Sequence, residues 1–189
     1  MSSKIVVSIV CSTMTMFAAE HMSIAVCNLG GVPERTVAGA KSVVGAIFSP
    51  LGVEVDWKRC EDSGSALNIV LRLLRKGPAG EPRGDSLQAM GMAFTRAGVA
   101  GSRADVYFGA IDELASLRQA DPAEVLGYVV AHELGHLLGL GHFAGGIMSA
   151  SWNDKMLKAA RKRWLKFNDS QCAAIHRALQ KRTLLAGWG

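Results

Sequence analysis

The sequence predicts one α/β (α+β) domain, in which a twisted mixed sheet with an early packed helix is followed by further helices. Two observations indicate this fold class. Segments with strand character and one helical pattern occupy the first half of the chain, and capped helical patterns occupy the second. The chain has 189 residues, of which 49% are hydrophobic and 20% are charged. This length and composition are typical of one globular domain with a sizeable core.

Residues 1–19 have the order of a secretory signal peptide. One lysine precedes an apolar stretch from Ile5 to Phe17, and two alanines follow. The alternative is a buried first strand, because the apolar stretch also favours β-structure. We expect cleavage near Ala19, with a Ser-x-Ala site after Ala25 as the alternative. Removal of residues 1–19 would leave a folded domain over residues 20–189 and a secreted or periplasmic protein.

Five short segments rich in apolar and β-branched residues are expected to form the sheet. They are Met22–Cys27, Val53–Trp57, Leu67–Leu74, Gly91–Arg96 and Asp105–Phe108. An early helix is expected between the first two, because Pro33 suits the first helical position and apolar residues recur at helical spacing from Val37 to Phe48. Pro50 and Gly52 end this helix. The expected sheet is therefore mixed, with one helix packed on it.

Two helices are expected in the second half of the chain. The first begins at Asp121, which can cap it, and a proline and then Glu124 follow within three residues. This helix can continue to Gly139, because glycine commonly ends helices in the left-handed conformation. Asn168–Gln171 forms a second cap, which opens a helix over Ala173–Leu179.

The cysteines limit the possible disulfides. Removal of the first 19 residues would leave Cys27, Cys60 and Cys172, which allow at most one internal disulfide, and the sequence alone does not choose the pair. No Cys-x-x-Cys occurs, which argues against a zinc-ribbon or thioredoxin-type protein.

Positive charge is concentrated near the carboxyl end. The net charge is +5, and residues 155–189 contain nine basic side chains and one acidic side chain. This segment is either a solvated helical face or a patch for acidic substrates, an anionic cell surface or nucleic acid. No signature of a nucleic-acid-binding module accompanies it, so no nucleic-acid partner is expected. No apolar run reaches the ~18–20 residues that cross a bilayer, so no integral membrane segment is expected.

One motif carries chemistry. His132, Glu133 and His136 form H-E-x-x-H, and residues four apart lie on the same face of a helix, so both imidazoles can reach one metal ion. Gly139 then breaks the helix, and His142 completes H-E-x-x-H-x-x-G-x-x-H. Its five fixed letters would occur by chance on the order of once in 10⁵. Since no glutamate follows Glu133, His142 is the only well-placed third ligand.

The stretch HELGHLLGLGH, followed by Gly146-Ile147-Met148-Ser149, resembles the metzincin clan of zinc endopeptidases, and its matrixin-like members most closely. The resemblance implies one catalytic Zn²⁺ per chain with these residues: ligands His132, His136 and His142, general base Glu133, and Met-turn residue Met148. Only five residues, Phe143–Ile147, separate the third histidine from the methionine, which is shorter than the matrixin spacing. The resemblance therefore extends to the clan and to no named family.

The resemblance also implies that an edge strand pairs with extended substrate above the metal. Gly91–Thr95 is the candidate strand: Gly91 and Ala93 leave room on one face, and Met92 and Phe94 are expected to anchor the other face in the core.

Two further segments are candidate walls of the substrate pocket. Tyr128 and Val129 lie one turn before the first histidine of the motif, and Ser149–Trp152 follows the Met-turn. Ordinary core packing of an amphipathic helix is the alternative role for these side chains.

Together these patterns predict a secreted, monomeric zinc metallopeptidase. It would hydrolyse peptide bonds of a peptide or protein substrate through a metal-activated water, with Glu133 as general base. The alternative is a non-catalytic zinc-binding or protein-interaction domain on the same scaffold. The presence of Glu133 argues against it, and a purely structural zinc site would be expected to have a fourth protein ligand.

Overall fold

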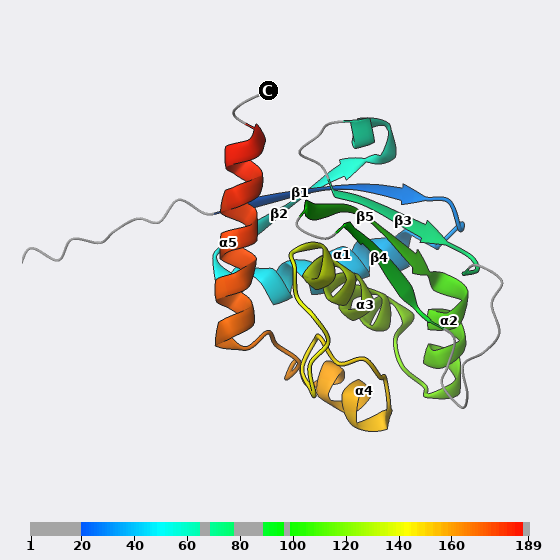
Figure 1. The fold of residues 1–189 in the computed structure, drawn as a ribbon. Helices are drawn as coiled ribbons and strands as arrows, with labels where there is room; N and C mark the ends of the chain where they lie inside the picture. The colour runs from blue at the N-terminus through cyan, green and yellow to red at the C-terminus, as the bar shows by residue number, and fades with distance from the viewer. Residues whose placement is uncertain (1–19, 65–68, 78–88, 97–98, 187–189) are drawn as a thin grey trace, which may run out of the picture.

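The structure is a computed structural model that describes residues 20–64, 69–77, 89–96 and 99–186. Its strands are β1 (Glu20–Asn28), β2 (Val53–Arg59), β3 (Ile69–Leu74), β4 (Gly91–Arg96) and β5 (Val99–Tyr107). Its helices are α1 (Glu34–Phe48), α2 (Phe108–Leu117), α3 (Pro122–Leu137), α4 (Asp154–Arg161) and α5 (Asp169–Ala186), with short 3₁₀ turns η1 (Ser49–Leu51) and η2 (Cys60–Gly64). Figure 1 shows the sheet as one layer, with α1 and α3 against one face.

The five strands form one mixed sheet in the order β2-β1-β3-β5-β4. β1 is parallel to β2 and to β3, and β3 is parallel to β5. Parallel neighbours need a crossover connection, and α1 makes it between β1 and β2. β4 is antiparallel to β5, with Ala93 opposite Ala104, and lies at one edge of the sheet. Gly91–Thr95 therefore lies in an edge strand, as expected.

The expected fold class is confirmed, with corrections to the elements. All five expected strands are present, although Leu67 and Asn68 of the third lie outside the described residues. β5 begins at Val99, and Phe108 is the first residue of α2 and not the last residue of a strand. Helices α2 and α4 were not expected. α2 has no side-chain cap, so its start carries no sequence signal. α4 is short, although the Asn153 side chain caps it by accepting from the Met156 N–H at 3.1 Å.

The core lies between the sheet and the α1–α3 layer. Ile24, Ile69 and Leu73 on the central strands are fully buried. α1 and α3 approach closely at Gly127, where any added Cβ would collide with the side chain of Val43. This packing fixes α3, which carries the histidine motif, beneath the sheet.

A disulfide links Cys27 at the end of β1 to Cys60 in η2, and Cys172 is a free thiol. The structure thus resolves the pairing that the sequence left open. None of the helices that the structure describes is long and apolar enough to span a membrane. The expected signal peptide, residues 1–19, lies outside the described residues.

Candidate active site

Helix α3 supplies two of the three histidines. It starts as the sequence predicts, because Asp121 accepts a hydrogen bond from the Ala123 N–H at 2.9 Å and Pro122 occupies the first position. Twelve of the sixteen residues of the helix are buried. The four-residue spacing of His132 and His136 places both rings on one face. The helix is thus a fixed support for the two rings.

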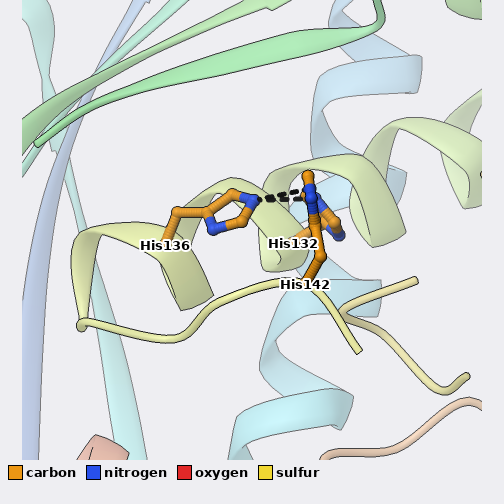
Figure 2. Close-up of side chains that lie close together, drawn as sticks. All are labelled: His132, His136 and His142. Atoms are coloured by element: carbon orange, nitrogen blue, oxygen red, sulfur yellow. Dashed lines mark hydrogen bonds between the residues drawn. The ribbon is translucent and has the colours of Figure 1, made fainter. Parts of the chain in front are cut away.

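The third histidine is brought back by a sharp turn after α3. Gly139 adopts the left-handed conformation with φ 88°, and the Leu140 N–H donates to the Gly135 carbonyl at 2.9 Å. The reversed chain places His142 beside the helix. Figure 2 shows the three rings converging, His142 from the turn and the other two from α3.

The ring nitrogens meet at the spacing of a metal site. The Nε2 atom of His136 lies 3.0 Å from Nε2 of His132 and 3.2 Å from Nε2 of His142. Three nitrogens at ~2.0–2.1 Å from a tetrahedral zinc would be about 3.3 Å apart. The observed distances therefore fit the donor set of a zinc site, and the three ligand atoms all lie within 4.8 Å of one another.

The tautomers of two rings also favour a cation. His132 Nδ1 lies 2.8 Å from the Ile147 carbonyl, and His136 Nδ1 lies 2.8 Å from the Leu140 carbonyl. Since a carbonyl only accepts, each Nδ1 donates and each neutral ring presents a bare Nε2 lone pair to the centre. Burial lowers the pKa of His132 to about 4, so its Nε2 atom stays unprotonated at neutral pH. The lone pairs that meet at the centre therefore repel one another, and a bound cation would relieve this repulsion.

Glu133 lies between α3 and the edge strand. Burial raises the pKa of its carboxyl to about 7, and a hydrogen bond from the backbone of Ala93 acts in the opposite direction. A Cβ at Gly91 would collide with the Glu133 carboxylate. The expected space at Gly91 is therefore filled by the carboxylate and is not open to a substrate side chain. β4 thus holds Glu133 in position.

Met148 is fully buried. A Cβ at Gly135, one residue before His136, would collide with its sulfur. The Phe143 N–H donates to the Met148 carbonyl at 2.8 Å, which closes the short loop between them. The five-residue spacing is thus sufficient to place this methionine against α3.

A cleft of about 840 Å³ opens over the three histidines and Glu133. Four of the five residues predicted to bind substrate line it: Gly91, Ala93, Val129 and Ser149. The structure does not place Tyr128 there. Its hydroxyl donates to the Ala160 carbonyl at 3.3 Å, and its ring packs against Trp152, which itself lines the cleft. Tyr128 instead lines a second cavity of about 620 Å³ between α1, α3 and the start of α5.

The two faces of β4 are opposite to the expected ones. Met92 and Phe94 are 42% and 37% exposed, whereas Ala93 packs against the core. The face toward α3 accepts only small residues, because Glu133 lies directly against it. The Arg103 guanidinium lies 3.9 Å from the centroid of the Phe94 ring and partly covers it.

The sequence analysis missed the contribution of α5 to the cleft. Ala178 and Lys181 line it, although they follow the motif by more than 35 residues. The only local signal was their i, i+3 spacing, which places both side chains on the same face of a helix.

The fold and the site contain the features that the resemblance to the metzincin clan implies: a mixed sheet with an antiparallel edge strand, a helix carrying H-E-x-x-H, a third histidine after a glycine turn, and a buried methionine. The crystal structure of archaemetzincin from Methanopyrus kandleri, at 1.5 Å resolution, is similar to it with a TM-score of 0.55. The two chains are 20% identical, and the match covers 85% of this chain and 97% of the other. This likeness shows the shared fold. No protein-family model matches the sequence, and no curated protein matches it significantly.

Proposed function

We propose that the chain is a zinc-dependent endopeptidase that holds one Zn²⁺ on His132, His136 and His142. The single observation that carries the proposal is the convergence of the three Nε2 atoms beside a buried carboxylate, in a cleft bounded by an edge strand. The fold shared with archaemetzincin supports it. The finer resemblance to matrixin-like members rests on the motif and the methionine turn.

Zinc, when bound, supplies a Lewis acid that polarises a peptide carbonyl and makes a water more acidic. Glu133 accepts the proton of the attacking water and delivers it to the leaving amine. The Ala93 backbone orients the Glu133 carboxylate from one side. The exposed edge of β4 offers backbone groups to an extended substrate, which would lie across the cleft as an added strand.

Secretion or export to the periplasm, and action as a monomer on peptides or proteins, are parts of the same proposal. The order of residues 1–19 supports export. The Cys27–Cys60 disulfide supports it too, because disulfides persist mainly in oxidising compartments. The rival function, a non-catalytic zinc-binding or interaction domain, would keep the metal and bind partners without turnover.

A peptide-library digestion read by mass spectrometry separates the two functions. The parent protein should contain one zinc per chain and cleave peptides, and a chelator should abolish cleavage. Glu133→Ala should keep its zinc and fold but lose about 10²–10⁴-fold in kcat/KM, since it removes the base and not a ligand. A zinc-loaded parent that cleaves no peptide would favour the rival function.

A further inference from the structure

Helix α5 closes one end of the cleft and brings a cation into it. Ala178 and Lys181, one turn apart, line the cavity that also contains the three histidines and Glu133. Lys181 is exposed, so its ammonium is accessible to a ligand in the cleft.

The directions of the strands show which end of the cleft Lys181 occupies. Glu20, the first residue of β1, accepts a hydrogen bond from Gln180 at 3.0 Å and pairs with His176 at 2.8 Å. The parallel strands β1, β3 and β5 start at the same side of the sheet, and the antiparallel β4 ends there. Figure 1 shows α5 beside the start of β1. Lys181 therefore lies toward the Thr95 end of β4, and Gly91, against Glu133, marks the other end.

This end of the cleft carries an unbalanced positive charge. Apart from the histidines, Glu133 and Lys181 are the only ionisable side chains that line the cleft within the described part of the chain. No described residue forms an ion pair with Lys181. The nearby carboxylate of Glu20 is engaged by His176 and Gln180. A substrate group of negative charge would therefore find an unpaired partner here.

Because this inference rests on the proposed peptidase function, it concerns which peptides are cleaved. We propose that Lys181 selects substrates carrying a carboxylate at the α5 end of the cleft. The carboxylate belongs either to an aspartate or glutamate side chain or to the free carboxyl terminus of a peptide. Both offer the same anionic oxygens to the ammonium.

Matched peptides test the selection. In the first set, peptides that are otherwise identical carry either Glu or Gln, placed first near one end of the peptide and then near the other. In the second set, two peptides differ only in having a free or an amidated carboxyl terminus. The parent should prefer the carboxylate by about two- to fivefold in kcat/KM, the range of an exposed ion pair. The preference should fall as ionic strength rises. The pair that shows it identifies the source of the carboxylate.

Two charge-reversal variants separate a local contact from the general field of the protein. Lys181→Glu should abolish or reverse the preference, making Lys-containing peptides the better substrates. Lys158→Glu, an identical change at an exposed position of α4 outside the cleft, should leave the preference ratio as in the parent. The proposal would be overturned if the parent cleaved carboxylate and neutral peptides with equal kcat/KM. It would also be overturned if Lys181→Glu and Lys158→Glu changed the preference ratio by the same amount.

Binding to zinc-loaded Glu133→Ala, measured by fluorescence anisotropy with the same labelled peptides, tests Lys181 without turnover. Tighter binding of the carboxylate peptides that is lost on adding Lys181→Glu would support the inference, even if the parent cleaved no peptide and the peptidase function had to be abandoned. Cleavage without any carboxylate preference would leave the peptidase function and remove this inference alone.

Discussion

Replacing Gly91→Ala tests whether β4 positions Glu133, the proposed general base. The added Cβ would lie 2.8 Å from both Cγ and Cδ of Glu133, whereas ordinary contact begins at 3.4 Å. The Glu133 side chain or the strand must therefore move by at least about 0.6 Å. A misplacement of ~1 Å in an active site can cost ~10²-fold in rate, so we expect kcat/KM to fall by about 10- to 100-fold. Zinc content should stay at the parent value, because no ligand is touched.

Gly45→Ala is the matched control for this change. Gly45 lies in α1 with nothing within 4 Å of an added Cβ, so activity should not change and stability should be equal or about 0.5–1 kcal/mol higher. Peptide hydrolysis, metal analysis and denaturant unfolding of the parent, Gly91→Ala and Gly45→Ala measure these effects. Gly91→Ala with parental kcat/KM would refute the positioning role.

A double-mutant cycle separates the carboxylate from a general disturbance of the strand. Denaturant unfolding is measured for Gly91→Ala, Glu133→Ala and the combined variant. If the Cβ collides with the Glu133 side chain, Gly91→Ala should destabilise the parent but not the Glu133→Ala background, with a coupling of about 0.5–3 kcal/mol. An equal cost in both backgrounds would mean that the strand and not the carboxylate is affected.

Three further changes test the metal site, the core and the disulfide. His142→Ala should greatly weaken zinc binding, because two ligands on one helix leave the tetrahedron incomplete, and metal analysis after dialysis would show parental zinc if this were wrong. Tyr128→Phe should lose about 1 kcal/mol of stability through the hydrogen bond to Ala160 but keep parental kcat/KM; a fall in activity would return Tyr128 to the substrate site. Cys27→Ser with Cys60→Ser should lower the free energy of unfolding by about 2–4 kcal/mol, and an unchanged denaturation midpoint would contradict a stabilising bridge.

The convergence of the three histidines could be predicted because the information for it is local. The spacing of His132 and His136 within one helix turn decides that their rings share a face, and Gly139 decides that the chain reverses before His142. The expectation of strands also depended on local composition. In each case, residues within a few positions of one another were sufficient to set the backbone.

The faces of β4 could not be predicted from the same kind of information. Alternation along a strand separates Ala93 from Met92 and Phe94, but it does not say which set is buried, because a shift of one residue exchanges the two faces. Hydrophobicity favours burying the larger side chains. The structure reverses this choice, because α3 brings Glu133 against the strand and leaves room only for small residues.

The role of α5 lies beyond local patterns for a related reason. Lys181 reaches the cleft because Gln180 and His176 attach the helix to Glu20, across sequence separations of 160 and 156 residues. The chemistry of the site thus has two origins. Neighbouring residues in one motif bring the three histidines and Glu133 together, whereas contacts between the two ends of the described chain place Lys181 at the end of the cleft. Variation in α5 would therefore change which peptides fit while the histidines and Glu133 stay the same.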